Sequence, residues 1–299
     1  MKWKNVFCCI PGFRFGAAGI TVREAAATLF GPPKLPRYIV AAIQSIALAA
    51  GMCGASALMA EPVPVQIFQT SAGPVDITPI YHATAMIRAG GDTIYIDPAY
   101  PANISGLHAG DLILITHTHP DHFYPAYITK LSGPNTKVIG PAAVQKTLKT
   151  AQVLSNGQSI HWRHWKITAV AMYNIHHLMP NGQPYHPKGA GNGYVLSYGG
   201  KNFYFAGDTE ETPEMRALRN IDVAFIPMNL PYTMSPEEAA AAVRTFKPKI
   251  AIPYHYRGQD PQRFADALRG SGIEVRLLDW YSNIAPGARP MQTPPRKAP

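Results

Sequence analysis

The chain places four side chains that can bind a metal ion within six residues, directly after the apolar run at residues 112–115. These side chains are His117, His119, Asp121 and His122. Imidazole and carboxylate groups are ligands that zinc and similar divalent ions accept. A strand that ends in a tight turn can direct His117 and His119 at one ion, and Asp121 and His122 at another. We therefore expect a metal-dependent hydrolase with two ions, because one site would not need all four ligands.

Short apolar runs and a few helical segments alternate along the body of the chain. Expected strands lie at residues 65–69, 77–87, 93–96, 112–115, 137–139, 165–173, 194–198, 202–206, 223–226, 250–253 and 275–278. Expected helices lie at residues 142–149 and 261–268, and between Ser235 and Pro248, where Pro236 and Glu238 complete an N-terminal cap. This mixture predicts an α/β (α+β) fold in which sheets pack face to face with helices outside.

Two further strands also end in residues that can bind a metal ion. The apolar run at residues 202–206 leads into Gly207-Asp208-Thr209, and the run at residues 250–253 leads into Tyr254-His255. The ends of such strands can meet at one edge of a packed core, where rigid elements hold the side chains and loops stay open to substrate.

Composition and charge argue against several other classes of protein. The 299 residues are 46% hydrophobic and 15% charged, which is typical of a globular chain. The net charge of +9 lies mostly at the ends, since residues 1–60 carry six Lys/Arg and one Glu and the tail carries Arg289, Arg296 and Lys297. About +1 remains for the body, which holds no basic run, so we expect no nucleic-acid partner.

The N-terminal segment has the order of a secretory signal. Residues 39–60 are apolar and small, follow Lys34 and Arg37, and contain the cleavage-like motif Ala55-Ser56-Ala57. We expect a mature chain that begins near Leu58 or Glu61, in the periplasm or outside the cell. The alternative is a retained membrane anchor at residues 38–60, which would bring the protein into contact with a membrane.

The three cysteines, Cys8, Cys9 and Cys53, all lie in this segment. Cys53 invites a lipoprotein interpretation, but Met52 before it fits such a site poorly. Any metal in the mature domain must therefore be held by nitrogen and oxygen. We expect three regions: an N-terminal extension with signal peptide or anchor at residues 1–60, the hydrolase domain at 61–285 and a disordered, Pro-rich, basic tail at 286–299.

The motifs in this order resemble those of the metallo-β-lactamase superfamily. The resemblance rests on the first cluster, His186 with the Gly-rich stretch after it, the Gly207-Asp208-Thr209 turn and His255, and runs from Ile77 to His255. It is greatest to the ascorbate-6-phosphate-lactonase-like and phospholipase-D-like branch. It implies a four-layer αββα sandwich of the metallo-β-lactamase type.

The resemblance also implies a role for each ligand. One metal would be held by His117, His119 and His186, and the second by Asp121, His122 and His255. Asp208 would bridge the two ions. True β-lactamases of this superfamily use a thiolate ligand, so Asp208 favours the branch that cleaves phosphodiesters, thioesters or lactones over antibiotic hydrolysis.

Some assignments leave alternatives open. The pair His176-His177 competes with His186, which we favour because Gly193-Tyr194 fits the family motif. His82 and Asp97 match motifs near the metals and are expected to support ligands or contact substrate, the alternative being plain hydrogen bonding at a strand end. Other residues expected near the pocket are Tyr173, Asn174, Tyr232, Thr233 and Met234. Residues not expected as ligands are His108, His161 and His164.

The chemistry follows from two neighbouring cations. A water that bridges them loses a proton near neutral pH, and the resulting hydroxide attacks the substrate while one metal polarises its oxygen. We expect Asp121 or Asp208 to accept the proton. We expect His82 to support a ligand or to contact the substrate. No serine or cysteine nucleophile motif is present in the mature chain.

The expected function is an exported binuclear hydrolase. It would cleave a phosphodiester, including phospholipid-like ones, or a lactone or other ester of a small-molecule or lipid-like substrate. The expected cofactors are two divalent ions, zinc first and manganese or iron as alternatives. The alternative functions are a thioester or β-lactam hydrolase and a non-catalytic metal-binding protein on the same fold. The sequence makes no prediction of the oligomeric state.

Overall fold

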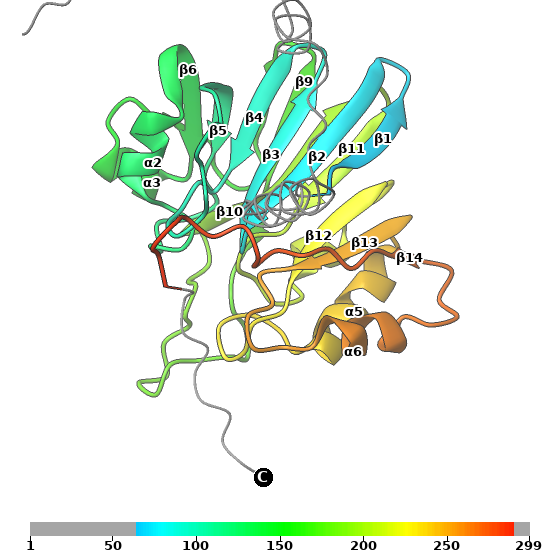
Figure 1. The fold of residues 1–299 in the computed structure, drawn as a ribbon. Helices are drawn as coiled ribbons and strands as arrows, with labels where there is room; N and C mark the ends of the chain where they lie inside the picture. Colours follow the sequence, from blue (N-terminus) through cyan, green and yellow to red (C-terminus); the bar gives the residue numbers. More distant parts are fainter. Residues whose placement is uncertain (1–63, 290–299) are drawn as a thin grey trace, which may run out of the picture. The chain divides into compact units, whose positions relative to one another are not determined.

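Two seven-stranded sheets form the framework of residues 64–289, the part of the chain that the computed structural model describes (Figure 1). The first sheet contains β1 (Gln66–Thr70), β2 (Gly73–Tyr81), β3 (Thr84–Ala89), β4 (Asp92–Ile96), β5 (Gly110–Leu114), β6 (Ser132–Gly140) and β7 (Gln152–Val153). The second sheet contains β8 (Ser159–Trp162), β9 (Trp165–Met172), β10 (Gly191–Tyr198), β11 (Lys201–Phe205), β12 (Val223–Pro227), β13 (Ile250–Tyr254) and β14 (Glu274–Val275).

Each sheet is antiparallel in one part and parallel in the other. Strands β1 to β4 pair antiparallel, and β4 to β7 pair parallel. In the second sheet β8 to β11 are antiparallel and β11 to β14 are parallel. Parallel strands end at a common edge. The residues that follow β11 and β13 are therefore brought to the same edge of the second sheet.

Parallel strands need long crossover connections, and helices form most of them here, although residues 97–109 join β4 to β5 without a helix. Within the described residues, α2 and α3 join strands of the first sheet and α4, α5 and α6 join strands of the second. Their bounds are α2 (Pro125–Lys130), α3 (Ala142–Thr147), α4 (Pro213–Arg216), α5 (Pro236–Phe246) and α6 (Pro261–Ala267).

Apolar side chains divide the fold into four layers. The inner core lies between the sheets and includes the fully buried Ile87, Trp165 and Phe205. Ile128 and Val144 of α2 and α3 pack on the outer face of the first sheet, and Val243 and Phe264 of α5 and α6 pack on that of the second. The expected αββα sandwich is confirmed.

Most expected elements are present, with differences at the ends. Helix α5 begins as expected, because Ser235 Oγ accepts a hydrogen bond from the Glu238 amide at 3.2 Å and the Glu238 carboxylate accepts one from the Ser235 amide at 2.7 Å. The run at residues 77–87 forms two strands, β2 and β3, because the chain reverses at His82. The short elements β7, β8, α2 and α4 were not predicted, since two to six residues carry little periodicity.

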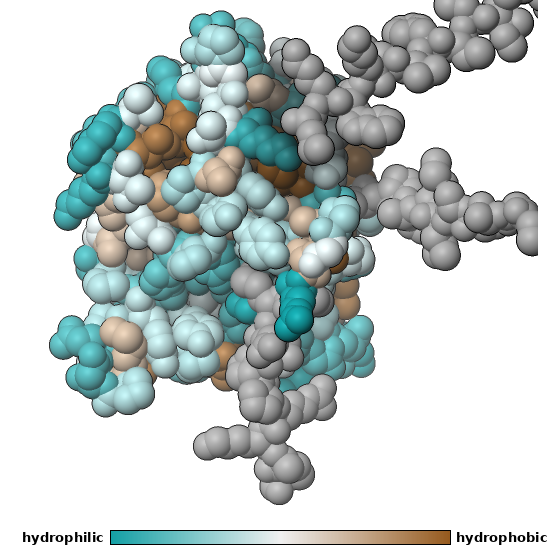
Figure 2. Space-filling view, turned by 60° about the vertical axis from the view of Figure 1, so that its left-hand side comes forward, coloured by the Kyte–Doolittle hydropathy of each residue, from teal (hydrophilic) through white to brown (hydrophobic). Residues whose placement is uncertain are grey.

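The surface of the described residues is mostly polar on the face that Figure 2 shows, with hydrophobic side chains in separate areas between hydrophilic ones. None of the helices between residues 64 and 289 is long and apolar enough to cross a membrane. The expected N-terminal extension, its cysteines and most of the expected tail fall outside the described residues, so those predictions stay predictions.

Candidate metal centre

Eight His and Asp side chains meet in two groups, where strand ends and loops come together. Cluster A is His117, His119, His186 and Asp208, and cluster B is His82, Asp121, His122 and His255. In each cluster every residue offers one ligand atom within 4.8 Å of the others. The loop after β5 contributes to both clusters, and the remaining residues come from the β2–β3 turn, the loop before β10 and the ends of β11 and β13.

The Asp208 carboxylate faces both clusters with different oxygens. Its Oδ1 lies 3.3 Å from His122 Nε2 and 3.3 Å from His255 Nε2, both in cluster B. Its Oδ2 lies 3.4 Å from His186 Nε2 and 3.9 Å from His117 Nε2, both in cluster A. The Asp208 carboxylate thus lies between the two clusters, which is the position that a bridging ligand would need.

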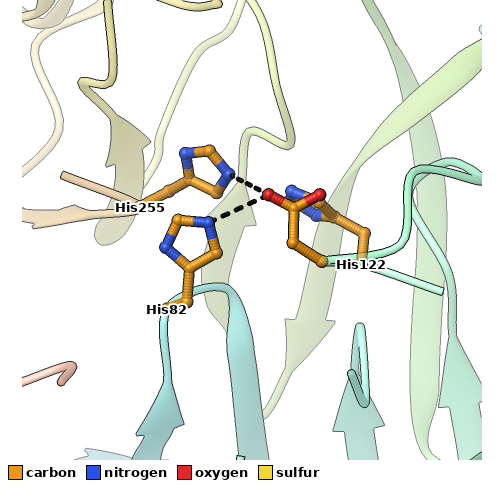
Figure 3. Close-up of side chains that lie close together, drawn as sticks. His82, His122 and His255 are labelled. Carbon is orange, nitrogen blue, oxygen red and sulfur yellow. Dashed lines mark hydrogen bonds and ion pairs between the residues drawn. The ribbon is translucent and has the colours of Figure 1, made fainter. Parts of the chain in front are cut away.

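Cluster B also contains a residue that the sequence suggested only for a supporting or substrate-contacting role. Figure 3 shows the rings of His82, His122 and His255 gathered around one point. Asp121 Oδ2 lies 3.2 Å from His82 Nε2 and 3.7 Å from His255 Nε2. His82 is therefore a candidate ligand as well.

Three residues at this centre have a left-handed backbone, which is uncommon outside glycine. The φ angles are 56° at His82, 44° at Asp97 and 50° at His255. Such conformations cost roughly 1–3 kcal/mol each and persist where the surroundings hold them in place. Here the His82 amide donates to the Trp280 carbonyl at 2.8 Å, and the His255 amide donates to the His82 carbonyl at 3.3 Å. The turn and the strand end are thereby locked to each other.

Gly207 allows the turn that delivers Asp208. Its φ is +67°, and a Cβ at this position would lie 2.6 Å from Met172 Sδ and 3.2 Å from the Asn192 carbonyl oxygen. Its amide donates to the Tyr254 hydroxyl at 2.8 Å. Only glycine combines this conformation with this close approach.

A buried carboxylate orients His122. Asp97 Oδ2 lies 2.8 Å from His122 Nδ1, and Asp97 also accepts from the Thr116 amide at 2.7 Å and from the Thr116 hydroxyl at 2.6 Å. When His122 is neutral, an Nδ1 hydrogen donated to Asp97 leaves the Nε2 lone pair facing the centre. This is the contact that a supporting carboxylate makes with a metal-binding imidazole.

Two other histidines are oriented by neutral groups. Asn174 Oδ1 lies 2.8 Å from His186 Nδ1 and accepts from the His186 amide at 2.8 Å, while its amide group donates to buried Glu210 at 3.0 Å. The Tyr281 hydroxyl lies 2.8 Å from His82 Nδ1. No sequence motif pointed to Glu210 or Tyr281, and Tyr281 lies beyond the last motif.

The competing pair His176-His177 lies outside both clusters. His176 is exposed, and His177 Nε2 lies 3.2 Å from the Glu238 carboxylate on α5. Their backbone amides donate to Glu210 at 2.8 and 2.7 Å. His186 occupies cluster A instead. His108, His161 and His164 are likewise outside the clusters.

The pKa values of three of the candidate histidines suit a cation. Burial lowers the pKa of His82 to about 3 and that of His186 to about 4, and burial also lowers the pKa of His117 well below its ordinary value. These rings are neutral at pH 7, as ligation requires. Burial also opposes charge on His122, but the carboxylates of Asp208 and Asp97 raise its pKa above the usual range.

Several buried nitrogen and oxygen atoms of the candidate ligands have no hydrogen-bond partner among the described residues. They are His117 Nε2, His122 Nε2, His255 Nδ1, His255 Nε2 and Asp208 Oδ1. A buried polar atom left in this way costs free energy, and native proteins rarely leave one without a reason. Nitrogen and carboxylate donors aimed at one another without hydrogen bonds fit divalent cations well.

Comparison with known proteins agrees with this geometry. A family profile described as "Beta-lactamase superfamily domain" matches residues 76–255, which include both clusters. A UPF0173 metal-dependent hydrolase of Symbiobacterium thermophilum is 33% identical over 229 residues, 71% of this chain and 96% of the relative. One from Thermus thermophilus is 30% identical over 219 residues, 68% of this chain and 96% of the relative.

A solved structure is also similar. The crystal structure of a protein from Parabacteroides distasonis, assigned as a metal-dependent hydrolase, superposes with a TM-score of 0.70 at 38% identity. The match covers 74% of this chain and 100% of that protein.

The choice between His186 and His176-His177 can be tested by metal content. His186→Ala should lower the bound metal of the purified protein from two ions per chain towards one, because cluster A then keeps only three of its four donor residues. The matched control, His176→Ala with His177→Ala, should keep both ions. Elemental analysis of both variants makes the measurement, and the reverse pattern would show that the third ligand of cluster A is misassigned.

The support of His82 by Tyr281 gives a second test. Tyr281→Phe removes the hydroxyl at His82 Nδ1 and keeps the ring, so the affinity for metal should fall about 10- to 100-fold. Tyr256→Phe is the control, because its hydroxyl bonds to the Leu278 carbonyl and not to a ligand. Competition with a chromogenic chelator measures the affinity. Equal affinities for metal in the two variants would show that the Tyr281 hydroxyl does not support His82 as a ligand.

Proposed function

The chain belongs to the β-lactamase superfamily and is a metal-dependent hydrolase, and from this premise we propose that it binds two divalent ions, one in cluster A and one in cluster B. With these ions it would cleave a phosphodiester, a lactone or another ester. The observation that carries the proposal is the Asp208 carboxylate, which presents one oxygen to each cluster. A carboxylate so placed can contact two cations and offset their mutual repulsion.

We propose zinc as the native metal, with manganese and iron as alternatives. All donors of the two clusters are imidazole nitrogen or carboxylate oxygen, which each of these ions accepts. When bound, two such ions supply an acidified water and a Lewis acid for the substrate oxygen.

The two carboxylates of the centre differ in their access to solvent. The Asp208 side chain is 4% exposed and the Asp121 side chain 22% exposed. Both can take up a proton that the reaction releases, but Asp121 can also pass it on to water. His82 Nε2, 3.2 Å from Asp121 Oδ2, fixes the direction of that carboxylate. We therefore assign the transfer of the proton to the Asp121 carboxylate and the bridging position to Asp208.

The cavity beside the clusters sets the size of the substrate. It has a volume of about 310 Å³ and contains Asp121, His186, Asp208 and His255 in its wall. Its remaining lining includes Met179, Tyr185, Asn229, Tyr232 and Arg257. A larger cavity of about 480 Å³, beside β9 and α4, contains none of the clustered residues. The smaller cavity thus accommodates a small molecule or a headgroup next to the clusters.

Phosphodiesters and lactones are favoured over β-lactams by the type of ligand at residue 208, and a thioester stays the alternative substrate. The chain has aspartate there, and its cysteines lie only in the N-terminal segment. The sequence motifs resemble the branch with lactonase-like and phospholipase-D-like members. A non-catalytic role is disfavoured because both clusters retain a full set of donors.

Replacement of Asp208 tests the proposal. Asp208→Asn should lower metal occupancy and reduce the hydrolysis of model phosphodiesters and lactones at least about 100-fold, because a neutral amide is a poor bridge between cations. Elemental analysis and a panel of phosphodiester, lactone, thioester and β-lactam substrates make the measurement. The control is Asp222→Asn, whose carboxylate pairs with Lys201 and Lys249 at another place and should change neither quantity.

Retention of two metals and of the parent rate in Asp208→Asn would overturn the bridging role. Turnover of thioesters or β-lactams alone by the unaltered protein would replace the proposed substrate class.

We also propose that the protein is exported, on the strength of the apolar segment at residues 39–60. Fractionation of the producing cell should find it outside the cytoplasm, and N-terminal sequencing should find a start between Leu58 and Glu61. A soluble cytoplasmic protein that retains Met1 would contradict export, and a membrane-bound one that retains residues 38–60 would favour the anchor.

A further inference from the structure

Arg257 is a cation in the wall of the cavity that the metal chemistry does not use. It follows His255 by two residues at the end of β13, and it is the one Lys or Arg among the described residues that line this cavity. Its side chain is 17% exposed. Its nearest carboxylate oxygen is Asp121 Oδ2, at 3.6 Å from Nη2, which is too long for a hydrogen bond.

The guanidinium therefore has hydrogen-bond donors to spare. Among residues 64–289 no hydrogen bond from its side chain to another group is formed, and the contact with Asp121 is an ion pair at long range. A guanidinium carries five N–H donors in a planar fork that matches a carboxylate or a phosphate group. A side chain that is mostly buried beside a cavity, with these donors unused, is suited to bind an anion that enters the cavity.

The position of Arg257 is built into the centre. Its backbone lies near the Tyr281 hydroxyl, which is the same hydroxyl that lies 2.8 Å from His82 Nδ1. The His255 amide in turn donates to the His82 carbonyl. These contacts connect the backbone after β13 to the turn at His82, so the arginine side chain starts beside cluster B.

The charge of the cavity favours an anion. The described lining contains two carboxylates, Asp121 and Asp208, and both belong to the clusters. Two divalent cations would exceed the charge of those carboxylates, and Arg257 adds a further positive charge. A neutral substrate gains nothing from this field, a cationic one is repelled, and an anionic one is attracted.

The rest of the wall offers a place for an apolar part of such a molecule. The rings of Tyr185 and Tyr232 lie 5.0 Å apart, edge to face, and Met179 lines the same cavity. These side chains are polarisable and suit a flat or aliphatic group.

We propose that Arg257 binds an anionic group of the substrate, so that the substrate class is a small phosphate- or carboxylate-bearing ester whose charged group lies beside the bond to be cleaved. The inference rests on the proposed function, because it places the substrate in the cavity of clusters A and B. It goes further in naming a specificity residue and the charge that the residue selects.

Binding of two anionic probes to the metal-loaded protein tests this directly. Phenylphosphonate and benzoate stand for the phosphate and the carboxylate, and isothermal titration calorimetry gives their Kd for the parent chain and for Arg257→Gln. The variant keeps the length of the side chain and removes its charge. We expect a Kd that is about 10- to 100-fold weaker, the usual effect of a lost hydrogen bond to a charged group. Loss for phenylphosphonate alone, or for benzoate alone, identifies which anion the site takes.

Arg263→Gln is the matched control. This arginine lies on α6, is well exposed and pairs with Glu237, so its replacement should leave the Kd of both probes unchanged. Arg257→Lys should recover part of the affinity, since it restores the charge without the planar fork. Metal content is measured in every variant.

A kinetic comparison separates this inference from the proposed function. The KM of Arg257→Gln should rise more for the anionic bis(p-nitrophenyl) phosphate than for the neutral phenyl acetate. If the parent chain hydrolyses neither substrate but the calorimetric difference is found, the proposed reaction is wrong and the anion site stands. Equal Kd values for both probes in the parent and Arg257→Gln, or loss of metal from that variant, would overturn the role of Arg257.

Discussion

The arrangement of the centre depends on one buried carboxylate that faces two sets of imidazoles. The Asp208 side chain is 4% exposed, and removing such a charge from water costs several kcal/mol or more unless it is paired. Burial opposes its ionisation, but the neighbouring His122, His255 and His186 hold its pKa well below the usual range. The carboxylate therefore stays charged inside the protein. Because it is charged, the same side chain can face the imidazoles of both clusters. The surrounding backbone must hold the carboxylate in that position.

The fold meets the requirement by fixing backbone that would otherwise relax. His82, Asp97 and His255 have left-handed φ angles, and Gly207 makes the turn into Asp208. Hydrogen bonds between segments far apart in sequence hold these positions, such as the one from the His82 amide to the Trp280 carbonyl. The two sheets supply the rigidity, because large side chains such as Trp165 and Phe225 are fully buried between them. Strain at the centre is thus balanced by packing in the core.

Much of the fold followed from local patterns in the sequence, and the grouping of the candidate ligands followed from the resemblance to the metallo-β-lactamase superfamily. Alternation of apolar runs with turn residues located most strands, and Ser235 to Glu238 located the start of α5 because that cap needs only neighbouring residues. What the sequence missed depends on contacts between distant segments. Tyr281 reaches His82 across 199 residues, and the left-handed turn at His82 brings that ring among the candidate ligands. Arg257 lies two residues from His255, but only the structure shows that it lines the cavity.

The central claim is that clusters A and B each hold a divalent ion and share Asp208. Anomalous X-ray diffraction from crystals of the metal-loaded protein, collected at the absorption edge of the bound metal, tests it most directly. The account predicts two anomalous peaks per chain, one among His117, His119 and His186 and one among Asp121, His122 and His255, with Asp208 in contact with both. A single peak in a fully active protein, or two peaks of which Asp208 contacts only one, would contradict it.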